Sequence, residues 1–204
     1  MFTLSLWDGK VGQTLLPLVE ALNDEMLRCS VLHADESPIQ VLTHKGDAKR
    51  AYIWAFSASP GQATKAVIYE INDGRSGEHA RRFLRRSDNE DDSSPRQERQ
   101  APWCGHLMVD DFAGYKALFQ HAPPGAPPPV IELGCWAHAR RKFHELFVAN
   151  RSPMAEQALQ HIAQLYAVEA DIKVRQLDAQ QAQQLRAQRS LPRLEAFKVC
   201  LAAC

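Results

Sequence analysis

The chain has 204 residues, of which 45% are hydrophobic and 24% charged, as in an ordinary soluble globular protein with room for one domain and an extension. Lysines and arginines number 24, as do aspartates and glutamates, so the formal net charge is zero. This balance excludes attachment to nucleic acid through a general positive charge, and any such partner would need local basic patches.

No run of residues is long and apolar enough to span a bilayer, and the first seven residues lack the basic start of a signal peptide. The five cysteines are odd in number and include no CxxC pair, which fits a reducing compartment better than a disulfide framework. We therefore expect a cytoplasmic protein without a membrane partner.

The first predicted element is a helix over residues 11–28. Its apolar positions recur at helical spacing, and Asp8-Gly9 is a plausible start signal. Nothing on it is chemically unusual, so its expected role is packing. The stripe consists of Val11, Leu15, Leu18, Val19, Leu22 and Met26.

The next stretch, Val31 to Ser37, is a short apolar run that ends in Asp35 and Glu36 and is stopped by Ser37-Pro38. This pattern predicts a buried strand whose last residue emerges at the end of a sheet. Ligands and metals collect at that end in open α/β sheets. A turn capped by Asp35 explains the stretch equally well.

Two further strands are predicted over residues 51–57 and 66–71, and the three strands pair most simply as an antiparallel meander. Ser76 is a good N-cap for a short helix that runs to Arg86. Four arginines crowd this helix, and a solvated face is favoured over phosphate contacts. They are Arg81, Arg82, Arg85 and Arg86.

A second apolar run that ends in carboxylates, residues 106–111, predicts a fourth strand, and a short helix follows over residues 112–119. A polar surface loop is expected before this strand, over residues 87–101, and an extended proline-rich connector over 122–129. The fifth strand, residues 130–136, runs into a helix over residues 137–147.

Beyond this helix the chain becomes helical throughout. Ser152-Pro153 is a good N-cap and N1 pair. A helix follows it, then a glutamine-rich run over residues 178–189 and a last amphipathic piece that runs into Cys204. No Gly, Asn or Pro closes that piece, so we expect the chain to be a fragment.

The order of these elements is the layout of a ribonuclease H-like α/β core, a mixed five-stranded sheet flanked by helices, here with a C-terminal all-helical extension. In that layout the first and fourth strands are parallel neighbours, so Asp35 and Asp110 would lie close together at one end of the sheet. Two adjacent carboxylates repel unless a cation lies between them, and oxygen ligands suit Mg²⁺ or Mn²⁺. Such ions activate a water or a 3′-hydroxyl for attack on a phosphodiester.

Four motifs then carry a family resemblance. HADESP, RSGEH, VDDFAGY and CWAHARRKF occur in this order and cover nearly the whole chain. They resemble the central domain of the insertion-sequence-66 family of DDE transposases. The resemblance implies that Asp35 and Asp110 are the first and second catalytic, metal-binding acids. Asp111 stands where this family often has glycine and is interpreted as a neighbour.

The resemblance also implies a third acid, a glutamate that follows a helical segment interrupting the core. No residue of this chain matches it, and the N-terminal DNA-binding portion of the family also has no counterpart here. Glu145 is the in-chain candidate only by simpler ribonuclease H analogy. We expect an N-terminal helical segment (1–30), a catalytic core lacking its last part (31–150) and a truncated helical insertion (151–204).

The function expected from this resemblance is metal-dependent DNA cleavage and strand transfer during transposition, with transposon ends and target DNA as partners and an oligomer in the full-length protein. The fragment is expected to be inactive alone. Four residues at the start of one helix are candidates for phosphate contacts, although a solvated face has equal weight. They are His138, Arg140, Arg141 and Lys142.

Three alternatives remain. One is a non-catalytic DNA-binding or oligomerisation remnant of a transposase. Another is a stand-alone nuclease that uses Glu145. The last is a zinc site, for which the usual paired CxxC spacing is absent; its residues would be Cys104, His106, Cys135 and His138.

Overall fold

The computed structural model describes residues 4–42, 46–84, 102–119 and 130–202. The chain forms two compact units, Met1–Gly134 and Cys135–Cys204. Arg85 and Arg86, the loop over 87–101 and the connector over 122–129 lie outside the described residues.

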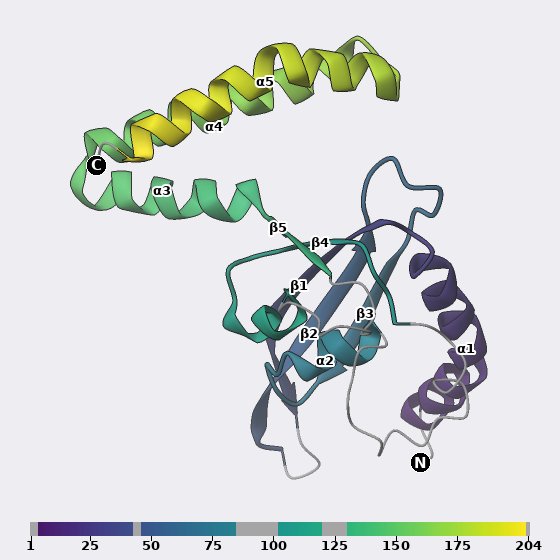
Figure 1. The fold of residues 1–204 in the computed structure, drawn as a ribbon. Helices are drawn as coiled ribbons and strands as arrows, with labels where there is room; N and C mark the ends of the chain where they lie inside the picture. The colour runs from purple at the N-terminus through teal and green to yellow at the C-terminus, as the bar shows by residue number, and fades with distance from the viewer. Residues whose placement is uncertain (1–3, 43–45, 85–101, 120–129, 203–204) are drawn as a thin grey trace. The chain divides into compact units, whose positions relative to one another are not determined.

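The first unit is built on a five-stranded mixed sheet in the order β3-β2-β1-β4-β5 (Figure 1). Its strands are β1 (Val31–Leu42), β2 (Ala48–Ala58), β3 (Val67–Asn72), β4 (His106–Val109) and β5 (Ile131–Gly134). The first three pair antiparallel, whereas β1 with β4 and β4 with β5 are parallel. The ribonuclease H-like fold expected from the sequence is thereby confirmed, with the first and fourth strands as parallel neighbours.

Among the residues described in this unit, the sheet is accompanied by α1 (Leu4–Met26), α2 (Glu78–Phe83) and the 3₁₀ helix η2 (Ala113–Phe119). The predicted start of the first helix at Asp8-Gly9 is wrong, because the helix begins at Leu4 and runs through both residues. The hydroxyl of Ser76 accepts a hydrogen bond from the backbone N–H of Glu78 at 3.2 Å, as expected of a residue that opens a helix. The N-cap position itself is Gly77.

One apolar cluster holds the sheet and these helices together. Phe56 of β2 stacks on Phe83 of α2 with ring centroids 3.7 Å apart, and Trp54 meets Tyr115 of η2 edge-on at 5.9 Å. Leu32 and Leu107, paired partners on β1 and β4, are fully buried beneath them. The core therefore fixes β1, β4, α2 and η2 relative to one another.

The second unit is a group of three helices, α3 (Trp136–Asn150), α4 (Pro153–Val174) and α5 (Ala179–Ala202). Ser152 caps α4 as predicted, since its hydroxyl accepts from Ala155 N at 3.3 Å and Pro153 opens the helix. The last two predicted pieces form one helix, α5, which continues through Pro192.

The boundary between the two units falls after Gly134, whereas the sequence predicts a boundary after residue 150. The reason is that α3 packs with the other two helices: Trp136 and Phe143 both contact the buried ring of Phe197, at 6.1 and 6.2 Å between centroids. No helix in the described part of the chain is long and apolar enough to cross a membrane.

Candidate functional site

Asp35 lies within β1, and Asp110 directly follows β4, the parallel neighbour of β1. The register of β1 and β4 joins residues 75 positions apart, from Val31 with His106 to His33 with Met108. Asp35 and Asp110 are also 75 positions apart, and Asp110 directly follows the last residue of β4. Neighbouring strands are about 4.8 Å apart, so a continuation of this register past the end of β4 would bring the two acids close together.

The expectation that the first strand ends at Asp35 is wrong. β1 continues through Pro38 to Leu42, because β2 supplies an antiparallel partner along its whole length, with Pro38 opposite Tyr52. What ends near Asp35 is β4, the partner on the other side. Beyond that level no described strand pairs with this side of β1, and an edge is where a strand tolerates proline.

The two aspartates differ in their surroundings. Asp35 is exposed, and its Oδ1 accepts a hydrogen bond from the backbone N–H of Glu36 at 3.0 Å. The side chain of Asp110 is 22% exposed, and its Oδ1 accepts from the backbone N–H of Phe112 at 2.9 Å. The neighbouring Asp111 pairs instead with Lys116 at 3.0 Å.

Glu36 is a buried carboxylate for which no role was predicted from the sequence. Its side chain is fully buried; Oε1 accepts from Arg75 Nε at 2.7 Å, and Oε2 accepts from the hydroxyl of Tyr115 at 2.5 Å. The alternation of side chains along β1 could have identified it, because Leu32, Ala34 and Glu36 share the buried face while the residues between them are more exposed. A carboxylate on the buried face requires a partner of opposite charge.

Burial and pairing set the protonation of this group. Burial raises the pKa of Glu36, while the hydrogen bonds from Tyr115 and Arg75 act in the opposite direction. Burial also raises the pKa of Tyr115, and the bond to Glu36 adds to that shift, so the phenol remains a proton donor. Burial disfavours the charge on Arg75, but the Glu36 carboxylate outweighs it and raises the pKa of Arg75.

Three of the four sequence motifs meet in this network. Glu36 belongs to HADESP, Arg75 to RSGEH, and Asp110 and Tyr115 to VDDFAGY. The guanidinium of Arg75 lies 3.8 Å above the ring centroid of Phe112, and its Nη2 is 4.0 Å from Oδ2 of Asp110. The motifs are therefore joined by one chain of contacts from Tyr115 to Asp110.

The donor set fits a hard divalent cation. Asp35 and Asp110 supply carboxylate oxygens at exposed or half-buried positions, and Mg²⁺ commonly takes one or two carboxylates while keeping several waters. Glu36 is turned into the core and engaged by Arg75, so it is not a third ligand. Within the described ranges, no three or more His, Cys, Asp or Glu side chains form a metal-binding group, and the zinc alternative gains no support.

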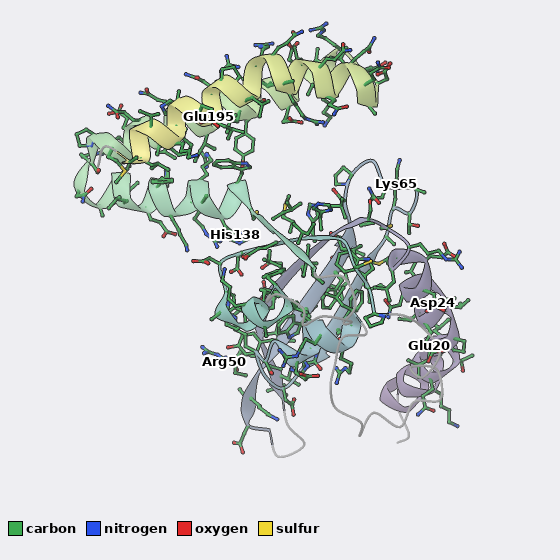
Figure 2. All side chains as sticks on the ribbon, viewed as in Figure 1. Glu20, Asp24, Arg50, Lys65, His138 and Glu195 are labelled. Carbon is green, nitrogen blue, oxygen red and sulfur yellow. The ribbon has the colours of Figure 1, made fainter. Side chains whose placement is uncertain are left out.

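The predicted phosphate-binding residues lie on α3, in the second unit (Figure 2). Arg140, Arg141 and Lys142 are exposed, and His138 is half-buried. Glu145 is exposed on the same helix. On α2, by contrast, Arg81 pairs with Glu78, and Arg82 contacts Asn72 and Glu70, so both arginines already have partners within the protein.

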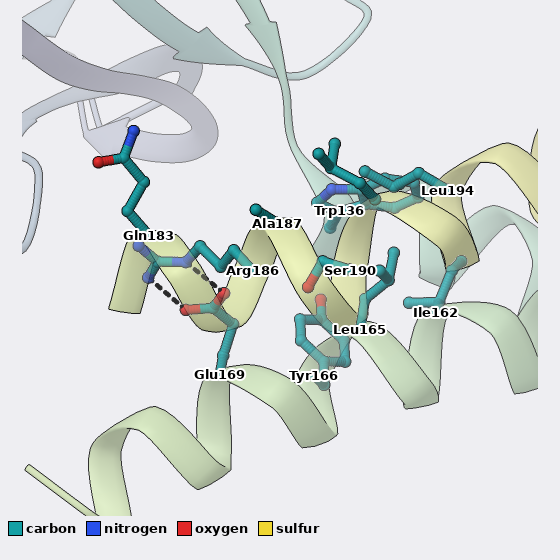
Figure 3. A pocket seen from close by; sticks show the side chains of 11 residues that line it. Trp136, Ile162, Leu165, Tyr166, Glu169, Gln183, Arg186, Ala187, Ser190 and Leu194 are labelled. Atoms are coloured by element: carbon teal, nitrogen blue, oxygen red, sulfur yellow. Dashed lines mark hydrogen bonds and ion pairs between the residues drawn. The ribbon is translucent and has the colours of Figure 1, made fainter. Parts of the chain in front are cut away.

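A cavity of about 500 Å³ lies between α4 and α5 beside Trp136 (Figure 3). Its wall is mainly apolar, with Leu165 and Leu194 among the lining residues. At one end Arg186 donates two hydrogen bonds to Glu169, at 2.7 and 2.6 Å. This cavity was not predictable from the sequence, because the glutamine-rich run gives no sign of which faces of the helices meet.

A family model described as "Transposase IS66 family" matches residues 2–204. Two curated relatives come from Sinorhizobium fredii (strain NBRC 101917 / NGR234), and both are named only as uncharacterized proteins. The chain is 26% identical to y4qI over 193 residues, covering 92% of this chain and 32% of the relative. It is 28% identical to y4jD over 200 residues, covering 95% of this chain and 36% of the relative. The chain thus spans about a third of the length of these relatives. No solved structure matches it significantly.

Proposed function

Since this chain belongs to the IS66 family of transposases, we propose that it carries two carboxylates of a metal-dependent DNA cleavage and strand-transfer site, Asp35 and Asp110. The observation that supports this most is the parallel pairing of β1 with β4, whose register joins residues 75 positions apart, the same spacing that separates Asp35 from Asp110. Carboxylate pairs at such a position hold Mg²⁺ or Mn²⁺ in enzymes that act on phosphodiesters.

Each acid has a distinct part in the proposed site. The Oδ1 atom of Asp110 accepts from the amide of Phe112, and its carboxylate would be one of the two that hold the cation. Asp35 is exposed and provides the second carboxylate where solvent and DNA can approach. A bound divalent ion would supply Lewis-acid activation of a water or 3′-hydroxyl and neutralise the leaving oxygen.

DNA is the proposed partner, held in part by α3. Its exposed Arg140 and Arg141 can contact phosphates without reading sequence, and Lys142 and His138 lie within a turn of them. The third acid of the family has no assigned counterpart in this chain, so we expect residues 1–204 alone to bind a metal weakly and to leave DNA uncut.

The metal site is tested by titrating Mn²⁺ into residues 1–204 and measuring the affinity by calorimetry. Asp35→Asn and Asp110→Asn are each expected to weaken binding at least tenfold. Asp111→Asn is the matched control, because Asp111 adjoins Asp110 but pairs with Lys116. Equal affinities for all three variants would remove the basis of the proposed site.

The contribution of α3 is tested separately by fluorescence anisotropy with duplex DNA over a range of salt concentrations. Arg140→Gln and Arg141→Gln should each weaken binding to all sequences alike and reduce the salt slope by about 1. Lys198→Gln on the exposed surface of α5 is the control. A non-catalytic DNA-binding fragment would show these changes in DNA binding, but Asp35→Asn and Asp110→Asn would not change its Mn²⁺ affinity.

A further inference from the structure

Arg75 lies between a buried carboxylate and a proposed metal ligand. We infer that Arg75, anchored by Glu36, is a positioning residue that holds Asp110 in place through Phe112 and through its own guanidinium. This inference deepens the proposed function and rests on it. None of the contacts described below requires a bound metal.

The guanidinium is immobilised on one side by Glu36. Both Nε and Nη2 of Arg75 reach Oε1 of Glu36, at 2.7 and 2.5 Å. Glu36 is itself fixed, because it is fully buried and its second oxygen accepts the Tyr115 hydroxyl at 2.5 Å. A planar guanidinium with two nitrogens on one carboxylate has little freedom to rotate.

Phe112 connects this anchored arginine to Asp110. Its ring supports the guanidinium face, with 3.8 Å from Arg75 Cζ to the ring centroid. Its backbone N–H donates to Oδ1 of Asp110 at 2.9 Å. Phe112 therefore contacts the arginine through its ring and the aspartate through its backbone N–H. A shift of Phe112 would also move the Asp110 carboxylate.

The guanidinium also faces Asp110 directly. Arg75 Nη2 is 4.0 Å from Oδ2 of Asp110, beyond a hydrogen bond but within the range of an ion pair. The arginine side chain is 41% exposed, so this attraction is partly screened by solvent. This attraction acts on the orientation of the Asp110 carboxylate, because the amide of Phe112 holds Oδ1 while the fixed guanidinium of Arg75 attracts Oδ2.

The backbone brings the two segments together. Arg75 lies between β3 and α2, and Asp110 lies between β4 and η2. The connection that leads into α2 touches the start of η2 where Gly77 meets Gly114, at a separation that leaves no room for a Cβ on Gly77. The placement of Arg75 beside Asp110 is thus part of the packing between α2 and η2.

The test uses residues 1–204 without metal and follows the backbone amide of Phe112 by hydrogen exchange. Arg75→Gln is expected to accelerate exchange of this amide about tenfold and to weaken Mn²⁺ binding by a similar factor. Arg75→Lys keeps the positive charge but loses the contact of two nitrogens with Glu36. Its Phe112 exchange rate and Mn²⁺ affinity should lie between those of the wild type and of Arg75→Gln. The control Arg81→Gln removes an arginine that pairs with Glu78 on α2, and it should change neither value.

Unchanged Phe112 exchange and unchanged Mn²⁺ affinity in Arg75→Gln would overturn the inference. Arg75→Gln leaves a buried carboxylate without its cation, which can prevent folding. The double variant Glu36→Gln/Arg75→Gln removes both charges and keeps the test decisive. If the wild type fails to bind Mn²⁺ through Asp35 and Asp110, the proposed function fails, while Phe112 exchange still decides the role of Arg75.

Discussion

Gly77 and Gly114 meet backbone to backbone: a Cβ added to Gly77 would lie 1.8 Å from the carbonyl oxygen of Gly114. This contact joins the start of α2 to η2 and sets the distance between the segments that carry Arg75 and Asp110. The close approach therefore requires glycine at position 77, whereas a Cβ on Gly114 would meet the ring of Phe112 at 2.3 Å.

Gly77→Ala is expected to destabilise the first unit by about 3 kcal/mol, because the new methyl group must displace backbone and not a flexible side chain. Urea unfolding followed by circular dichroism measures the change. Gly74→Ala is the matched control, since a Cβ there meets nothing within 4 Å, and it should shift stability by less than about 0.5 kcal/mol. Equal stability of the two variants would contradict the close contact.

Tyr115→Phe is expected to cost about 1–3 kcal/mol, because it removes the hydroxyl that donates to the buried Glu36 and leaves that oxygen without its donor. The measurement is again the free energy of unfolding in urea. Tyr69→Phe, at a site that is 64% exposed on β3, should have almost no effect. A neutral Tyr115→Phe would mean that Glu36 does not depend on this bond.

The pH dependence of stability should carry a contribution from Glu70 on β3. Burial raises the pKa of Glu70 above its ordinary value of 4.5, and Arg82 only partly opposes this. A raised acid pKa stabilises the fold below pH 4.5, and that contribution is lost as pH rises through the raised pKa. Glu70→Gln should therefore gain stability relative to wild type over this interval, measured by unfolding at a series of pH values. A constant difference would contradict the shift.

Phe197→Ala is expected to destabilise the second unit by about 3–5 kcal/mol, because the ring is 4% exposed and contacts Trp136, Phe143 and His161. Thermal unfolding followed by circular dichroism reports the change. Val199→Ala, two residues away at a side chain that is 68% exposed, is the control. If both variants unfold alike, the three helices do not share this core.

The order and pairing of the strands could be predicted from the sequence because apolar runs, turn residues and helix signals alternate regularly. The length of β1 could not. Ser37-Pro38 resembles a stop, but the partner strand β2 extends far enough to hold the chain straight through Pro38. Tertiary pairing thus overrode a local signal.

Only part of the candidate site could be predicted from the sequence, again because local patterns do not report tertiary contacts. Asp35 and Asp110 follow from a resemblance and from the parallel pairing that it implies. Glu36 and its partners do not, because a carboxylate beside another carboxylate resembles a simple acidic pair until the alternation along β1 assigns it to the buried face. The arginine and tyrosine that satisfy it lie 39 and 79 positions away, beyond the reach of local patterns.

Past the end of β4, no strand in the described ranges pairs with the adjoining stretch of β1 on that side, and main-chain amides and carbonyls at such an edge can recruit an extended peptide from another molecule. Pro38 stands within that stretch and has no N–H to offer. A peptide that added to this side of β1 could pair with residues 34–37 or with residues 39–42, but Pro38 interrupts the hydrogen bonds between them. This proline therefore disfavours aggregation through the edge of the strand.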